Sequence, residues 1–146
     1  MIVDPQADYF LDTNILVYAY DRSAGHKHSL AVQLVEECWK NENGCLSIQV
    51  LQEFFVTVAR KISTPLDDQT ARNIVADLTH WRVQAPEASD LLQAIDLQQS
   101  YHLSFWDAMI VQSAARLGCK QLISEDLNHG QLYGDVQVIN PFRGVD

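Results

Sequence analysis

The sequence predicts an α/β protein in which helices cover both faces of a five-stranded parallel sheet. Short apolar runs that suit buried strands alternate with longer segments of helical periodicity. Two of the runs end in an acidic side chain, as βα units with a ligand site do. The 146 residues, 47% of them hydrophobic, are enough for one domain with a substantial core. We therefore expect a single domain over residues 1–146, with its core at about residues 9–141.

Composition argues against several classes of protein. No apolar run approaches the roughly 18 residues needed to cross a bilayer, and residues 1–5 lack the features of a signal peptide, so we expect a cytoplasmic protein. Three cysteines without CxxC spacing indicate neither a disulfide framework nor a zinc site. The net charge of −9 argues against broad electrostatic adhesion to nucleic acid. It is compatible with an acidic cleft that loads metal ions and with a basic protein partner.

The first apolar run, residues 9–11, is predicted to be a buried strand that ends in a sharp turn at Asp12. Residues 15–20 are apolar on nearly every side and are expected to form a buried helix. An acid at the carboxyl end of the first strand lies where α/β sheets bind their ligands. The alternative is that Asp12 only caps the helix that follows it.

Further helices and two more strands are predicted in the middle of the chain. Helices are expected at residues 29–41, 49–62, 68–80 and 87–101, and strands at residues 45–48 and 81–85. Gly44 is expected to end the first of these helices, and Asp67 or Asp68 to cap the third. His26 and His28 are assigned to a solvated loop, because on a helix the pair would point to different faces.

Two of these helices carry acids whose environment matters for function. In the helix over residues 49–62, Glu53 lies off the centre of the apolar stripe, so a solvated glutamate is a direct alternative to a functional one. In the helix over residues 87–101, Leu91 and Leu92 are expected to face inward and Asp90 to face water.

A carboxylate is predicted on the buried side of the helix over residues 104–117. Asp107 precedes Ile110 by three residues and Ala114 by seven, which places it near the middle of the apolar face. A carboxylate there loses water, a costly change unless a cation, a metal or several hydrogen bonds replace it. The alternative is a capping box formed with Ser104, which explains the position of Asp107 but not its burial. The neighbouring Trp106, like Trp81, is predicted to be a core or interface anchor rather than a platform on which bases stack.

The last part of the chain supplies a fourth acid. Gly118 is expected just after the preceding helix, and residues 120–123 form a strand. Ser124 and Asp126 follow at the carboxyl end of this strand. A final strand is predicted over residues 136–139.

The four acids favour a metal site at one edge of the sheet. The strands place Asp12 and Asp126 there, and a first helical turn places Asp107 there, whereas Glu53 reaches it only if its helix runs beside the first strand. Carboxylates gathered in this way repel one another and suit Mg²⁺ or Mn²⁺. The chemistry that follows is metal-assisted phosphodiester hydrolysis. The sequence contains no glycine-rich phosphate loop, GxGxxG or GxSxG motif, so metal with acids is the only complete catalytic set.

Four segments in order resemble the motifs of the PIN-domain ribonucleases, and in particular the toxins of VapBC toxin–antitoxin pairs. Each segment is short, but their order and spacing together are specific, and the resemblance runs from about Tyr9 to Pro141. The segments are Phe10-Leu11-Asp12-Thr13-Asn14, Gln52-Glu53-Phe54, Phe105-Trp106-Asp107-Ala108-Met109-Ile110 and Leu122-Ile123-Ser124-Glu125-Asp126-Leu127.

The resemblance implies a PIN-like fold and an endoribonuclease that depends on Mg²⁺ or Mn²⁺; the choice of RNA over DNA rests on it alone. It also implies a homodimer and inhibition by a small antitoxin. It assigns roles residue by residue: Asp12, Glu53, Asp107 and Asp126 bind metal and carry catalysis, and Thr13, Asn14 and Ser124 support them.

Two alternatives from other classes stay open at this point. One is a haloacid-dehalogenase-type phosphotransferase, although Asn14 stands where that family has the second acid of Asp-x-Asp. The other is a catalytically silent PIN-like module that binds a partner. Retention of all four acids argues against the silent module.

Overall fold

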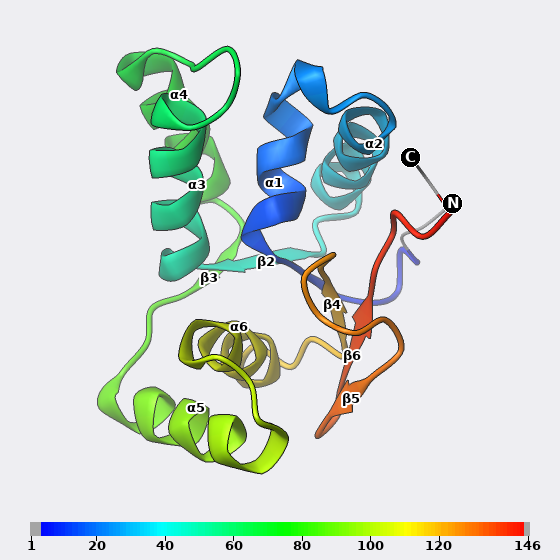
Figure 1. Ribbon diagram of the computed structural model, residues 1–146, viewed down its shortest axis with the longest axis vertical. Helices are drawn as coiled ribbons and strands as arrows, with labels where there is room; N and C mark the ends of the chain where they lie inside the picture. The colour runs from blue at the N-terminus through cyan, green and yellow to red at the C-terminus, as the bar shows by residue number, and fades with distance from the viewer. Residues whose placement is uncertain (1–3, 145–146) are drawn as a thin grey trace.

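The computed structural model describes residues 4–144, and over these residues a six-stranded sheet lies between two layers of helices (Figure 1). The strand order is β3-β2-β1-β4-β6-β5, and all neighbours are parallel except β5 and β6. The strands are β1 (Tyr9–Leu11), β2 (Gly44–Ser47), β3 (Arg82–Gln84), β4 (Gln121–Ile123), β5 (Leu132–Tyr133) and β6 (Val136–Ile139).

The helices divide between the two faces of the sheet, as predicted for an α/β protein. Figure 1 shows α1 to α4 on one face and α5 and α6 on the other. The bounds are α1 (Thr13–Tyr20), α2 (His26–Asn41), α3 (Ile48–Arg60), α4 (Asp68–Leu78), α5 (Ala88–Tyr101) and α6 (Phe105–Arg116), with a short 3₁₀ turn η1 (Arg22–Ala24). Within residues 4–144, no helix combines the length and apolar character that crossing a bilayer requires.

The predicted number of five strands is wrong by one, because a short antiparallel strand extends the edge of the sheet. In β5, Tyr133 pairs with Val136 of β6 across a two-residue turn. Gly134 opens this turn with a φ of 61°, a conformation that two-residue hairpins need and glycine adopts without strain. The strand is only two residues long, too short to show an alternating pattern.

Two local expectations near α2 are also wrong. His26 and His28 lie in the first turn of α2 rather than in a loop, and the Nδ1 atom of His28 lies 2.8 Å from the carbonyl oxygen of Tyr18. Gly44 does not end α2 but belongs to β2, where the ring of Trp81 leaves no room for a β-carbon. Asp67 does cap α4, and Gly118 does follow α6 with a positive φ.

The predicted inward face of α5 is only partly correct, because Leu97 packs against the core but two other leucines do not. Leu91 and Leu92 are exposed, whereas Asp90 and Ala94 are buried against α6. Asp90 is accommodated because Arg116 of α6 lies 2.9 Å from its carboxylate. A sequence pattern assigns such an acid to water because the cation that neutralises it comes from a different helix.

The pairing of β1 with β4 determines which residues lie together at one edge of the sheet. These neighbours are parallel, with Leu11 opposite Ile123, so both strands end at the same edge of the sheet. Asp12 and Ser124 are therefore the first residues beyond the two strand ends. All three residues of β1 are buried, which holds this edge in a rigid core.

Candidate active site

A cleft of about 600 Å³ opens at the carboxyl edge of the sheet, where α1, α3 and α6 meet the loop that follows β4. All four acids predicted for the site line it: Asp12, Glu53, Asp107 and Asp126. The structure therefore brings the four carboxylates to one place, although their catalytic and metal-binding roles stay a prediction.

Asp12 lines this cleft and is only 5% exposed. Its backbone is extended, and its side chain caps α1 by accepting a 2.7 Å hydrogen bond from the backbone N–H of Thr13. Its second oxygen accepts a 2.7 Å hydrogen bond from the hydroxyl of Ser124. The capping interpretation of Asp12 is thus correct, but it accounts for only one of the two carboxylate oxygens.

Burial has a large effect on the protonation of Asp12. It raises the pKa of this carboxyl from its usual 3.8 to about 6, and the charges of Asp126 and Asp107 raise it further, against the hydrogen bonds from Ser124 and Thr13. None of the hydrogen bonds that Asp12 makes within residues 4–144 comes from a basic side chain. The site therefore holds a buried negative charge that the described part of the chain does not neutralise.

Asp126 is oriented by neighbours from two elements. The side-chain amide of Asn14 donates a 3.0 Å hydrogen bond to its carboxylate, and its own backbone N–H donates to the hydroxyl of Ser124 at 3.2 Å. Ser124 is fully buried and contacts both Asp12 and Asp126. Asn14 and Ser124 thus contact the predicted acids, and their supporting role stays a prediction.

Glu53 reaches the cleft from α3, which answers a question that the sequence left open. Its residue is exposed, but its carboxylate accepts a 2.7 Å hydrogen bond from the hydroxyl of Thr13. Thr13 lies 40 residues earlier in the chain, beside Asp12. Because α3 packs against α1, Glu53 is turned toward the other acids rather than held only by water.

Asp107 enters from the first turn of α6. Its backbone N–H donates a 3.1 Å hydrogen bond to the side chain of Ser104, which caps the helix. Within the described residues, the carboxylate of Asp107 makes no hydrogen bond of its own, so the reciprocal half of a capping box is missing. Ile110, on the same face, is buried as predicted.

The donor set of this cleft fits a hard divalent cation. All four acids present carboxylate oxygens, the ligand type of Mg²⁺ and Mn²⁺, and the buried charge of Asp12 calls for a cation. As they stand, no three His, Cys, Asp or Glu side chains of residues 4–144 are grouped so that they could hold one ion. Binding one ion through three of the acids therefore requires their side chains to move closer together.

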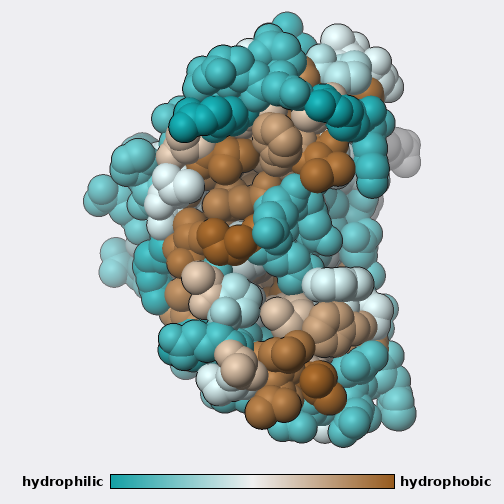
Figure 2. Space-filling view, turned by 90° about the vertical axis from the view of Figure 1, so that its left-hand side faces the viewer, coloured by the Kyte–Doolittle hydropathy of each residue, from teal (hydrophilic) through white to brown (hydrophobic). Residues whose placement is uncertain are grey.

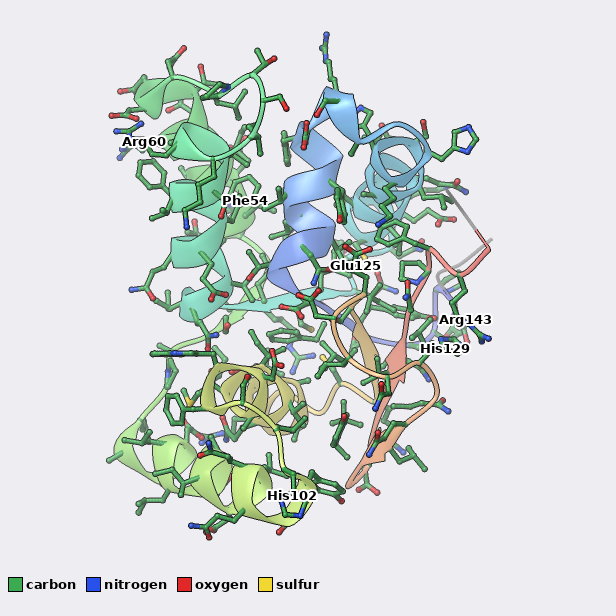
Figure 3. All side chains as sticks on the ribbon, in the orientation of Figure 1. Phe54, Arg60, His102, Glu125, His129 and Arg143 are labelled. Atoms are coloured by element: carbon green, nitrogen blue, oxygen red, sulfur yellow. The ribbon has the colours of Figure 1, made fainter. Side chains whose placement is uncertain are left out.

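A cluster of three hydrogen-bonded side chains beside the cleft was not predicted from the sequence: Tyr18, Lys27 and Glu125. Glu125 accepts hydrogen bonds from the hydroxyl of Tyr18 and, at 2.8 Å, from the ammonium of Lys27. Burial and the Glu125 carboxylate raise the pKa of Tyr18, which keeps its hydroxyl a donor. Figure 3 shows Glu125 where α1 meets the loop after β4. The residues come from three segments, so no sequence pattern joins them.

The cleft is also lined by residues that were not predicted there, including three with polar or aromatic side chains in or beside helices α3 and α6. Gln49 lies at the start of α3, Lys61 directly follows its end, and Trp106 lies in the first turn of α6. Trp106 is 61% exposed, which contradicts the core position but not the interface position that the sequence predicted for it as alternatives. The sequence signal for this placement is its position directly before Asp107.

Comparison with known structures identifies several chains of similar fold. A toxin–antitoxin complex from Klebsiella pneumoniae contains a chain 23% identical to this one, with a TM-score of 0.67 over 92% of this chain and 98% of that chain. The VapC20 toxin of Mycobacterium tuberculosis, described as cleaving the sarcin–ricin loop, is 19% identical, with a TM-score of 0.59 over 79% of this chain and 87% of that chain.

A third similar structure is VapBC2 of Rickettsia felis bound to promoter DNA, 18% identical, with a TM-score of 0.64 over 89% of this chain and 96% of that chain. At these identities the likeness establishes the fold alone. No curated protein sequence matches the chain. The sequence model of the PIN domain, however, matches residues 9–134, the range that carries all four acids and the strands that position them, so the chain belongs to the PIN domain family.

Proposed function

We propose that this chain is a nuclease and, more narrowly, a metal-dependent endoribonuclease that acts as the toxin of a toxin–antitoxin pair. The observation that carries the proposal is a cleft lined by four carboxylates, one of which, Asp12, is buried without a cationic partner among the described residues. Membership in the PIN domain family supports it, and so does the similarity to chains described as toxins. Because the chain belongs to the PIN domain family, we no longer consider a haloacid-dehalogenase-type phosphotransferase.

In this proposal Asp12, Glu53, Asp107 and Asp126 hold Mg²⁺ or Mn²⁺. When bound, the metal supplies an activated water and stabilises the charge that develops on the phosphodiester. The protein supplies the orientation of the acids. Thr13 holds Glu53 through its hydroxyl, Asn14 holds Asp126 through its amide, and Ser124 holds Asp12.

The neutral character of these three supporting residues is itself significant. Hydroxyl and amide donors fix a carboxylate in place without cancelling its charge, whereas a lysine or arginine would compete with the metal. The supporting residues therefore leave the negative charge of the cleft available to a cation.

A nuclease assay with matched variants tests the proposal. The purified chain is incubated with labelled single-stranded RNA or DNA of the same sequence, with Mg²⁺, with Mn²⁺, or with EDTA. We expect cleavage of RNA only with metal, its loss in Asp12→Asn, and unchanged cleavage in Asp96→Asn, which removes an exposed acid of α5 outside the cleft. Failure of the wild-type chain to cleave would favour the catalytically silent module.

The proposal extends to a protein partner. The net charge of −9 and the acidic cleft attract basic side chains, so we expect an antitoxin whose basic tail enters the cleft and competes with metal. Calorimetric titration of Mn²⁺ into the chain alone and into its complex with that antitoxin tests this, and equal affinities would contradict it. The similar structures described as toxin–antitoxin complexes support the idea.

The proposal also covers the oligomeric state of the chain and its location in the cell. Large apolar side chains are exposed on α3 and α5: Ile48, Val56, Leu91 and Leu92. Figure 2 views the molecule from the side where these helices lie and shows apolar surface bordered by polar side chains. Such surface suits a homodimer or an antitoxin contact. We propose a cytoplasmic homodimer in which residues 1–146 act as one domain, to be tested by sedimentation.

A further inference from the structure

We propose that Trp106 and Gln49 form a subsite for one nucleobase of the substrate, at the end of the cleft where α3 and α6 begin. This inference rests on the ribonuclease function proposed above and adds the residues that grip a base. Both residues line the same cleft as the four acids. Each lies close in sequence to one of them, Trp106 directly before Asp107 and Gln49 one helical turn before Glu53.

Trp106 presents an aromatic surface to the cleft. It is 61% exposed, more than any other tryptophan or tyrosine that the structure shows as exposed. Its ring packs edge to face against Phe105 with 4.9 Å between the ring centroids, which limits its rotation. A large aromatic side chain held in this way beside carboxylates offers a face on which a base can stack.

Gln49 supplies the polar part of the subsite. The residue is only 9% exposed, and its side-chain amide donates a long hydrogen bond of 3.4 Å to the carbonyl of Trp106. Its amide oxygen is buried and has no hydrogen-bond partner within the described residues. A buried acceptor without a partner is destabilising, so this oxygen indicates a donor that arrives with a ligand.

The two features together suit a nucleobase of single-stranded RNA. Proteins read unpaired bases by stacking them on aromatic rings and by hydrogen bonding to their edges. Here the side-chain amide of Gln49 contacts the backbone carbonyl of Trp106, so a residue with an exposed aromatic ring and one with an unpaired amide oxygen are neighbours in the cleft. The neighbouring acids, Glu53 and Asp107, are poorly suited to the apolar side chain of a protein partner.

Kinetics on a short single-stranded RNA separate this role from a structural one. With a labelled 12-nucleotide RNA and Mn²⁺, we expect Trp106→Ala to raise KM about 5- to 100-fold, the range that loss of one stacked base produces, with little change in kcat. Trp106→Phe keeps an aromatic face and should restore most of the affinity. Leu132→Ala, which shortens a 56% exposed side chain on β5, is the matched control and should leave KM unchanged.

Gln49 is tested through base preference. Gln49→Leu keeps nearly the same volume and removes the amide, so we expect the fold to persist with equal or greater thermal stability. Across four RNAs that differ at one nucleotide next to the cleavage point, the wild-type chain should prefer one base, and this variant should lose that preference. An unchanged preference would overturn the role of Gln49.

Fluorescence gives an independent signal, because the chain has three tryptophans. RNA should quench part of the emission of the wild-type chain, and this part should be missing in Trp106→Phe.

An unchanged KM in Trp106→Ala would overturn the inference, and so would a fall in kcat alone or a loss of self-association alone. If the wild-type chain shows Trp106-dependent quenching without cleavage, the subsite stands and the proposed hydrolysis fails; with neither signal, both fail.

Discussion

Asp12 and Asp90 are both buried carboxylates near the start of a helix, yet their surroundings change their pKa values in opposite directions. Asp90 is 1% exposed and accepts hydrogen bonds from the backbone of Glu87, from Gln112 and from Arg116. These contacts, the Glu87 backbone N–H first, hold the pKa of Asp90 below its usual value. Burial raises the pKa of Asp12 to about 6.

The two acids differ both in the number of their hydrogen-bond donors and in the charge of those donors. Asp90 has a guanidinium at 2.9 Å, so its negative charge is matched within the chain. The partners of Asp12, a hydroxyl and a backbone N–H, are neutral, and other carboxylates stand nearby. A buried acid that the fold neutralises is structural, whereas one left unmatched in a cleft is a candidate for binding a cation.

The largest effect should come from removing the unmatched charge. We expect Asp12→Asn and Asp107→Asn each to lower RNA cleavage by more than about 100-fold, the upper end of what loss of a residue supporting a metal ligand costs. Asp90→Asn should leave the specific activity of the folded protein unchanged. Initial rates at saturating Mn²⁺ compare the three variants, and near-wild-type activity in Asp12→Asn would remove it from the site.

A smaller loss is expected when only the support of Asp12 is removed. Ser124→Ala deletes a hydroxyl that donates to Asp12 at 2.7 Å and accepts from the backbone of Asp126 at 3.2 Å. We expect activity or Mn²⁺ affinity to fall about 10- to 100-fold. Ser23→Ala, on the exposed η1 turn, provides the control. Equal activity in both variants would show that Ser124 does not orient the site.

In the absence of metal, replacing Asp12 or Asp90 by asparagine should change the free energy of unfolding in opposite directions. At pH 7 we expect Asp12→Asn to raise the free energy of unfolding by about 1–3 kcal/mol, because it removes a charge whose pKa burial has raised. Asp90→Asn should lower the stability, because Arg116 then loses its partner. Denaturant titrations in EDTA measure both changes, and a loss of stability in Asp12→Asn would mean that its capping role dominates.

The pH dependence of unfolding provides a further comparison. Between about pH 4 and pH 6, native Asp12 keeps a proton that the unfolded chain has released, so stability should fall as the pH rises through this window. Asp90 acts oppositely, since its stabilisation is lost only as the pH falls below its usual pKa of 3.8. Metal-free melts from pH 4 to pH 7 should show a slope in the wild-type chain that Asp12→Asn removes.

The smallest effect on stability is expected at Glu53, which is exposed. Glu53→Gln should change the free energy of unfolding by no more than about 0.5 kcal/mol, because glutamine can still accept the hydrogen bond from Thr13. Its cleavage should nevertheless require more Mn²⁺. A titration of rate against Mn²⁺ concentration decides, and an unchanged midpoint would assign Glu53 to the solvated surface.

The sequence by itself determined the features that depend on near neighbours in the chain. The apolar run of β1, the cap at Ser104 and the positive φ after α6 follow from residues within a few positions of one another. The alternation of apolar runs with helical segments determined the α/β class as well. That class places Asp12 and Asp126 at one edge of the sheet, because parallel strands end there.

Only the tertiary structure decided which distant residues meet. Glu53 reaches the cleft because α3 packs beside α1, and Asp90 is buried because α6 brings Arg116 to it, 26 residues further along the chain. The exposure of Trp106 likewise depends on how α6 begins beside α3. A helical pattern shows which residues share a face, but the partner of that face, and so the charge of a buried acid, depends on packing between elements.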